Sequence, residues 1–227
     1  VLNKLNSYAN FDIKIFSSNK DLVRKKIKFL KSKKHFITEL ARQKQKYDFL
    51  ISVYFPWLIP RKLFNKFNNS INFHPSYLPI ARGWYPHVHA ILKNLKWGVT
   101  LHKISPGIDN GDIWCQKDIK FDEISSATEL HQKGKLEILK LFNKNFLKII
   151  NGKVEPKKQS GKATYFNRNS VKKYDELKLN KYYNLKDLIK LNSARTFKNK
   201  SFNFFRYKNK EYSFKISIKK ISNEKKK

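Results

Sequence analysis

The chain has 227 residues, of which 40% are hydrophobic and 15% aromatic, so it is long and apolar enough to fold around a buried core. Its formal net charge is +33, but the lysines are spread along the whole chain, which indicates compositional bias and argues against a dedicated nucleic-acid surface. One cysteine excludes an internal disulfide framework and fits a reducing compartment.

The first part of the chain alternates between strand-like and helix-like patterns. Residues 47–54 form a near-continuous apolar run, which is typical of a parallel strand covered on both sides. In chain order we predict the end of a helix at 1–9, a strand at 11–18, helices at 22–32 and 38–45, and a strand at 47–54.

The same alternation continues to about residue 150. We predict strands at 71–74, 97–104 and 112–121, a helix at 87–94, and a long amphipathic helix from Ser125 or Ser126 to about Ile150. This order predicts an α/β, Rossmann-like fold with an open, mostly parallel twisted sheet and helices on both faces.

A polar connector at 152–161 divides the chain into a predicted main domain at 1–152 and a C-terminal extension at 153–221. The extension contains a predicted helix at 184–192 and a hairpin formed by 200–208 and 210–221. A basic tail at 222–227 completes the chain.

The N-terminal residues lack the apolar segment of a signal peptide, and the longest apolar run, 49–59, is too short for a membrane span and contains a proline. We therefore expect a cytoplasmic protein. Because the sequence has no methionine, even at position 1, we expect it to begin inside a longer reading frame.

Two polar residues stand two positions apart in the segment INFHPSYLPIARG, at 71–83. Asn72 and His74 would share one face of a strand, and Pro75 would hold His74 at the carboxyl edge of the sheet, where open α/β folds bind ligands. A hydrogen-bonded strand end with a structural histidine explains these residues equally well.

A carboxylate follows in the loop SPGIDNGD. Asp109 lies between Gly107 and Gly111, and the loop leaves the next predicted strand, again at its carboxyl end. Such a loop could bring the acid to His74, where it would fix the orientation of the ring and favour its protonated form. By itself, an Asp in a glycine-flanked turn is more often structural.

Together these motifs resemble the folate-dependent formyltransferase superfamily. INFHPSYLPIARG and GVTLHKISPGIDNGDI match its pattern Asn-x-His-Pro-Ser-x-Leu-Pro, Arg-Gly, Gly-Val-Thr and Asp-x-Gly, and the likeness covers roughly residues 11–150. The resemblance implies formyl transfer from 10-formyltetrahydrofolate, without a metal, through a tetrahedral intermediate. It assigns catalysis to Asn72, His74 and Asp109.

The resemblance also implies two binding regions. The folate pocket would be formed by Phe55, Pro56, Trp57, Leu58, Ile104, Gly107 and Asp112. The acceptor would contact Arg82, Gly83, Trp84, Tyr85 and Tyr165.

The sequence leaves several candidates for the amine that accepts the formyl group. RGWYP and the C-terminal extension resemble the sugar N-formyltransferases, which act on the amine of a nucleotide-linked amino sugar (dTDP- or GDP-linked) for bacterial surface polysaccharide and are often homodimers. Methionyl-tRNA formyltransferase is the second reading, and a purine-biosynthetic transformylase is the third. A non-catalytic nucleic-acid-binding protein would use the charge alone.

One further expectation concerns a departure from the family. The family begins with a central strand that this chain lacks, so either the sequence is truncated or the sheet has a gap beside the strand at 11–17.

Among the other histidines, His87 and His89 are two apart on a predicted helix and do not face one another, so we reject a zinc site. For His102 we expect a packing role.

Overall fold

A computed structural model describes residues 1–7, 11–22 and 27–219 of the protein. Its helices are α1 (Leu2–Asn6), α2 (Lys33–Arg42), α3 (Pro86–Lys93), α4 (Ala127–Ile150) and α5 (Leu185–Arg195). Short 3-10 helices are η1 (Lys20–Leu22), η2 (Arg61–Lys66) and η3 (Lys172–Tyr174). The strands are β1 (Ile15–Ser17), β2 (Ile27–Phe29), β3 (Tyr47–Val53), β4 (Phe67–His74), β5 (Arg82–Gly83), β6 (Gly98–His102), β7 (Ile113–Asp118), β8 (Tyr165–Phe166), β9 (Thr196–Phe197), β10 (Lys200–Ser201), β11 (Phe204–Tyr207) and β12 (Lys210–Ser213).

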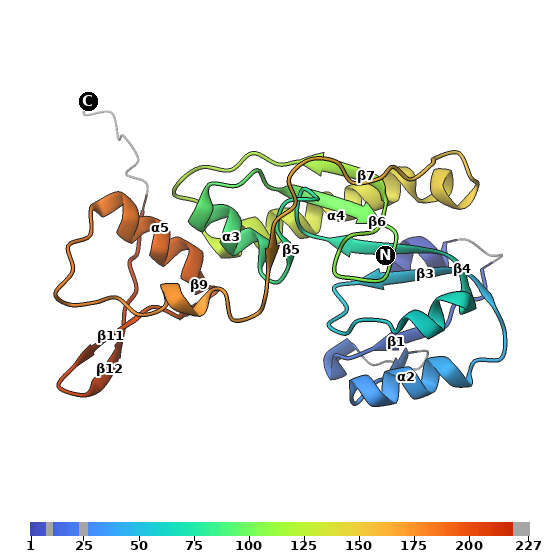
Figure 1. The fold of residues 1–227 in the computed structure, drawn as a ribbon, viewed down its shortest axis with the longest axis horizontal. Coiled ribbons are helices and arrows are strands. Elements are labelled where there is room, and N and C mark those ends of the chain that lie inside the picture. The colour runs from blue at the N-terminus through green and yellow to red at the C-terminus, as the bar shows by residue number, and fades with distance from the viewer. Residues whose placement is uncertain (8–10, 23–26, 220–227) are drawn as a thin grey trace, which may run out of the picture.

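The molecule is elongated (Figure 1). A four-stranded sheet with α4 against it occupies the middle, β1, β2 and α2 lie at one end, and α5 with the β11–β12 hairpin lies at the other. In the part of the chain that the structure describes, no helix has the length and apolarity to cross a bilayer.

The central sheet has the strand order β3-β4-β6-β7. Its first pair, β3 and β4, is parallel, as is the separate β1–β2 pair, whereas β6 runs antiparallel to both β4 and β7. The α/β class predicted from the sequence is confirmed. Among the described strands β1 pairs with β2 alone, which leaves the expected gap between it and the central sheet.

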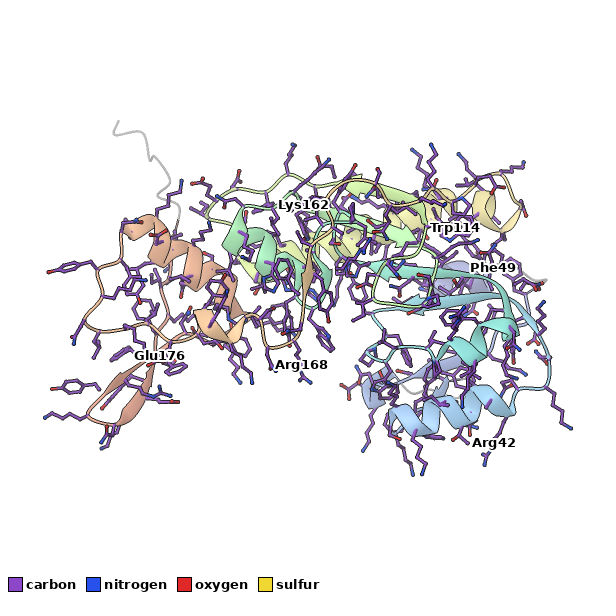
Figure 2. The ribbon with its side chains drawn as sticks, viewed as in Figure 1. Arg42, Phe49, Trp114, Lys162, Arg168 and Glu176 are labelled. Atoms are coloured by element: carbon purple, nitrogen blue, oxygen red, sulfur yellow. The ribbon has the colours of Figure 1, made fainter. Side chains whose placement is uncertain are left out.

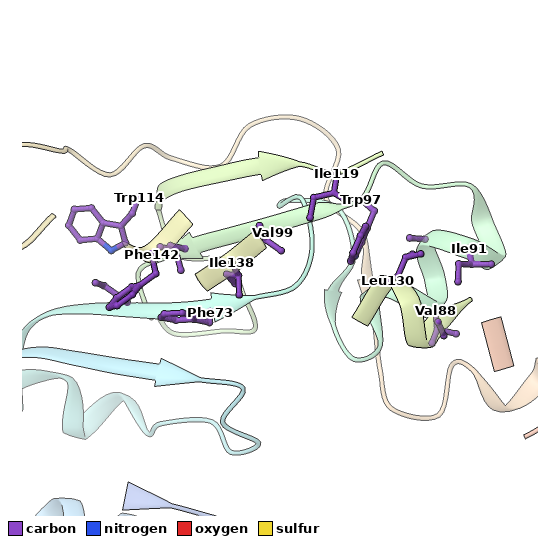
Figure 3. Close-up of a cluster of buried hydrophobic side chains, with 14 of the residues drawn as sticks. Phe73, Val88, Ile91, Trp97, Val99, Trp114, Ile119, Leu130, Ile138 and Phe142 are labelled. Atoms are coloured by element: carbon purple, nitrogen blue, oxygen red, sulfur yellow. The ribbon is translucent and has the colours of Figure 1, made fainter. Parts of the chain in front are cut away.

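The main core lies between the central sheet and α4 (Figure 3). Phe142 of α4 is fully buried, and its ring lies 5.0 Å from that of Phe73 on β4. Complete burial of one such side chain stabilises a fold by roughly 1.5–3 kcal/mol. Of the two predicted first residues of this helix, Ser126 is the N-cap, and it forms a capping box with Glu129.

The predicted helix at 22–32 is wrong over the described residues 27–29, which form β2, while residues 23–26 lie outside the described part. Ile27 and Phe29 are half-buried and Lys28 is exposed, so the segment also has a two-residue period. Pairing with β1 in parallel register decides between the two patterns. The next helix, predicted at 38–45, begins earlier, because Ser32 caps α2.

Two other segments differ in detail from expectation. Strand β3 is half-buried rather than covered on both faces, since it forms one edge of the central sheet. The predicted C-terminal hairpin is present as β11 and β12, but β10, which was expected to belong to it, pairs with β9. The domain boundaries remain a prediction, and the tail at 222–227 lies outside the described residues.

Basic side chains project from every visible side of the molecule (Figure 2). Nitrogen-tipped side chains extend from the α2 end, from the central sheet and from the C-terminal end alike. In this view, basic side chains of the described residues accompany each of the main groups of elements.

Candidate active site

The alternation of β4 separates an apolar face from a polar one. Ile71 and Phe73 are buried in the core against α4. Asn72 and His74 therefore point to the opposite face, since successive side chains of a strand alternate. Because apolar and polar residues alternate in β4, the amide of Asn72 and the imidazole of His74 lie side by side on the polar face.

A third polar side chain joins them from β6. The antiparallel register sets His102 opposite Asn72 and Thr100 opposite His74, so these four side chains share a face. The Asp109 loop follows the carboxyl end of this strand, as predicted, but β6 runs antiparallel to β4, so that end does not lie at the same edge of the sheet as the carboxyl end of β4. The loop after β6 instead starts beside Asn72.

That loop carries Asp109 into the site. The residue has a φ of 48°, in the left-handed region that Asp tolerates better than most residues. Its Oδ2 lies 3.4 Å from His74 Nδ1 and accepts from the Gly83 amide at 2.8 Å. Its Oδ1 lies 3.5 Å from Asn72 Nδ2 and 3.6 Å from His102 Nε2. The structure therefore brings the amide, the imidazole and the carboxylate together, with only 15% of the Asp109 side chain exposed.

Carbonyl partners determine the tautomers of both histidines, because a carbonyl oxygen can only accept. His102 Nδ1 lies 2.7 Å from Lys103 O and donates to it, which leaves Nε2 as the nitrogen that accepts from Asn72 Nδ2, 3.0 Å away. His74 Nε2 donates to Ala81 O at 3.1 Å. The Nδ1 of His74, which faces Asp109, is then the nitrogen that can gain or lose a proton.

For both His74 and Asp109, burial and the neighbouring polar groups shift the pKa in opposite directions. Burial lowers the pKa of His74, and the Asp109 carboxylate and the Ala81 carbonyl only partly offset the effect. Burial would raise the pKa of Asp109, but His74, His102 and the Gly83 amide more than reverse this, so the pKa lies below its usual range. Asp109 is ionised at neutral pH.

The residues predicted to form the folate pocket after β3 are divided between core and surface. Phe55 and Trp57 pack against a second hydrophobic cluster around Phe36, and the Phe36 and Phe55 rings lie 4.7 Å apart. Pro56 and Leu58 are exposed, Leu58 by 55%. The structure therefore gives the two aromatic rings a packing role, and their role toward folate remains a prediction.

The other predicted folate residues lie in the loop after β6. Ile104 lines a cavity of about 210 Å³, together with Leu50 and Ser70 on the polar face of the sheet, and its amide donates to Ser70 Oγ. Gly107 has a φ of 115° in the same loop, and Asp112 accepts from the Lys103 amide through its backbone. The role of these three residues toward folate remains a prediction.

The predicted acceptor residues lie on a short parallel ladder. Arg82 pairs with Tyr165, and Gly83 pairs with Phe166. A Cβ on Gly83 would lie 2.3 Å from Phe166 O, so glycine is required for this close approach. Trp84 and Tyr165 are 38% and 51% exposed, whereas Tyr85 packs against the main core.

Two side chains in contact with this site were not among the predicted site residues. His102 was expected to have a packing role, and it is buried, but it also bonds to Asn72. Gln159 of the connector donates to the carbonyls of Asp109 and Gly111 and accepts from Arg82. The register of β4 and β6 would have revealed His102, whereas no sequence pattern marks Gln159.

The helix histidines lie elsewhere. His87 and His89 are buried, and the His89 ring stacks on Phe166 at 3.7 Å. Within residues 1–7, 11–22 and 27–219, no group of three or more His, Cys, Asp or Glu residues is arranged to hold a metal ion.

Residues 7–143 match the profile of the formyl transferase family. The chain belongs to this family. It is 36% identical over 123 residues to methionyl-tRNA formyltransferase of Coprothermobacter proteolyticus, an alignment that covers 53% of this chain and 40% of that enzyme. The chain spans about half the length of other curated relatives that it matches.

Two solved structures extend the likeness. A 4-N formyltransferase from Francisella tularensis superposes with a TM-score of 0.85 and 26% identity over 96% of this chain and 92% of that one. An N-formyltransferase from Helicobacter canadensis, solved with folinic acid and dTDP-3-aminofucose, has a TM-score of 0.60 and 28% identity over 70% of this chain and 58% of that one.

Proposed function

We propose that this protein transfers a formyl group from 10-formyltetrahydrofolate to the amine of a nucleotide-linked amino sugar. The observation that carries the proposal is the convergence of Asn72, His74 and Asp109 on one face of the sheet in a chain of the formyl transferase family. The family relationship supports the reaction type, and the Helicobacter canadensis complex supports both the folate donor and the dTDP-sugar acceptor.

The proposed roles follow from the hydrogen bonds. When the acceptor amine attacks the formyl carbon, His74 Nδ1 takes the amine proton, and Asp109 stabilises the imidazolium that forms. As the tetrahedral intermediate collapses, the bond between the formyl carbon and N10 of the folate breaks, and the imidazolium returns its proton to that nitrogen, which leaves tetrahydrofolate and the N-formylated acceptor. One N–H of Asn72 is held by His102, whereas the other points to Asp109 at the long distance of 3.5 Å. That second N–H is the one we assign to the developing oxyanion.

The binding regions remain as the resemblance implies. Ile104, Gly107 and Asp112, with the segment after β3, would hold the pterin, and the exposed rings of Trp84 and Tyr165 would stack on the sugar or base of the acceptor. Both rings lie on the segments that carry the β5–β8 ladder, next to the Gly83 amide that bonds to Asp109.

Methionyl-tRNA is the second candidate acceptor, favoured by the 36% identity to the Coprothermobacter proteolyticus enzyme. The Francisella tularensis 4-N formyltransferase superposes over 96% of this chain with a TM-score of 0.85, so the likeness includes most of the segment after α4. The lysines are also spread along the whole sequence rather than gathered in one segment. We rank the sugar first for these reasons.

The test incubates purified protein with 10-formyltetrahydrofolate and either a panel of dTDP- and GDP-linked amino sugars or charged initiator tRNA, and detects the formylated product by mass spectrometry. We expect product with sugars and none with tRNA, and none with either in the His74→Ala variant. Product with tRNA alone would favour the second candidate. Salt-sensitive RNA binding without any transfer would instead indicate a non-catalytic nucleic-acid-binding protein.

The proposed reaction also implies a pathway, a cellular location and an oligomeric state. We infer a role in bacterial surface polysaccharide synthesis, such as that of lipopolysaccharide O-antigen, in the cytoplasm, where the lone Cys115 would stay reduced. We also infer a homodimer. Sedimentation velocity on the purified protein tests the dimer, and a monomer at micromolar concentration would contradict it.

A further inference from the structure

The side-chain amide of Gln159 is fully hydrogen-bonded between two loops of the site. Its Oε1 accepts from Arg82 Nη2 at 2.7 Å and from Nε at 3.2 Å. Its Nε2 donates to Asp109 O and to Gly111 O, both at 2.8 Å. An amide has two donor hydrogens and two lone pairs on its oxygen, so every hydrogen-bonding position of Gln159 is occupied.

These hydrogen bonds form part of a closed network that includes the Asp109 carboxylate. The Gly83 amide donates to Asp109 Oδ2 at 2.8 Å, and the neighbouring Arg82 reaches Gln159, which in turn holds the Asp109 backbone. Asp109 is thus fixed at both its side chain and its carbonyl. Its left-handed backbone is a conformation that a non-glycine residue keeps only when its surroundings determine it.

The segment that carries Gln159 is itself anchored at both ends. Lys157 exchanges two backbone hydrogen bonds with Ile113 of β7, at 2.7 and 2.9 Å. On the other side Thr164 accepts from the Ala81 amide at 2.8 Å and from the Arg82 amide at 2.9 Å. Gln159 therefore occupies a defined place between the two loops.

We propose that Gln159 is a positioning residue for the reaction: it sets the place of Asp109 relative to His74 and Gly83, so that the connector after α4 is part of the active site. This inference rests on the proposed function. It also gives Arg82 a role other than acceptor binding, since its guanidinium holds the oxygen of Gln159 from the opposite side.

Two variants separate the two halves of the amide. Gln159→Ala removes all four bonds. Gln159→Glu keeps an oxygen for Arg82 but replaces the donor to Asp109 O and Gly111 O with an acceptor. For both variants we expect kcat to fall about 10- to 100-fold, with the KM for the acceptor changed by less than about threefold, because misplacement of a reacting group slows the chemical step. Gln132→Ala on the exposed face of α4 is the matched control, for which we expect no change.

Two results would overturn the proposal: normal turnover in Gln159→Glu, or a raised KM for the acceptor with normal kcat in Gln159→Ala. Either result would mean that Gln159 acts through Arg82 on acceptor binding. Thermal unfolding of each variant shows whether it is folded at the assay temperature. If Gln159→Ala is unfolded there, Gln159→Glu, which retains the Arg82 pair, carries the test.

A second measurement does not depend on any activity. Nitrogen NMR of the His74 ring reports the carboxylate next to its Nδ1, together with the His102 ring and the Ala81 carbonyl that also face it. In Gln159→Ala we expect His74 to titrate at lower pH than in the wild type, because the carboxylate moves away. Gln159→Glu is not used for this measurement, because its own negative charge would raise the pKa of His74. An unchanged titration would overturn the proposal even if the wild-type protein formylates none of the tested acceptors, a result that would instead count against the proposed function.

Discussion

At the scale of single residues, the site consists of three polar side chains gathered around the carboxylate of a fourth. Asp109 lies within 3.6 Å of polar atoms of Asn72, His74 and His102, and it accepts from the Gly83 amide. A buried carboxylate persists in its ionised form only when such partners replace water. The geometry thus holds a negative charge next to a histidine that burial keeps neutral.

Asp109→Asn preserves the size of the side chain and removes the charge. We expect kcat for formyl transfer to fall about 100-fold or more, because the imidazolium that we propose to form at His74 would lose its counter-charge. The carboxylate raises the pKa of His74, so its removal should move the acidic limb of the pH–kcat profile to lower pH. Steady-state rates between pH 5 and pH 9 test both effects, and an unchanged profile would remove Asp109 from the mechanism.

His102→Leu leaves one N–H of Asn72 without its acceptor. We expect kcat to fall about tenfold and the free energy of unfolding to fall by about 1–3 kcal/mol, since a buried donor is left unpaired. His102→Gln offers a new acceptor and should recover part of both losses. Equal behaviour of the two variants would show that the ring is needed only for its volume.

At the scale of elements, the position of the site follows from strand alternation and from one long helix. β4 presents Ile71 and Phe73 to the core beneath α4, and this fixes the direction in which Asn72 and His74 point. The sequence predicted α4 closely, from its apolar period and its serine cap. It predicted β2 wrongly, because the same residues fit a helix locally and a strand only once β1 lies beside them.

Ser126→Ala removes the side-chain acceptor of the Glu129 amide at the start of α4. We expect the free energy of unfolding to fall by about 1 kcal/mol, because the first turn of the helix loses its cap. Urea denaturation followed by circular dichroism measures the change. Leu136→Ala in the same helix is the control, since 61% of Leu136 is exposed and its truncation should cost little. Equal losses in the two variants would argue against the capping box.

At the scale of the whole molecule, several histidines are buried in or near the core. Burial lowers the pKa of His87 to about 3 and that of His89 to about 4. Because both values lie below that of a histidine in the unfolded chain, the unfolded state binds more protons as the pH falls below about 6.5. The folded state is therefore most favoured above that pH and loses stability toward acid.

We expect His87 alone to reduce the free energy of unfolding by about 2 kcal/mol between pH 7 and pH 5. The His87→Phe variant keeps a flat ring and cannot titrate, so its stability should fall less over the same interval. Denaturant unfolding at the two pH values measures the difference. If both proteins lose the same stability, His87 does not contribute to the acid sensitivity.

Short stretches of the sequence by themselves determined the α/β class, the long helix and the trio of Asn72, His74 and Asp109, because periodicity and a dense local motif record which residues share a face or a loop. The tertiary structure alone decided that β6 runs antiparallel to β4, that His102 stands beside Asn72, and that Gln159 holds the Asp109 loop. The physical reason is that a local pattern determines which face of a strand is apolar, whereas the choice of pairing partner depends on hydrogen bonds and burial between segments far apart in the chain.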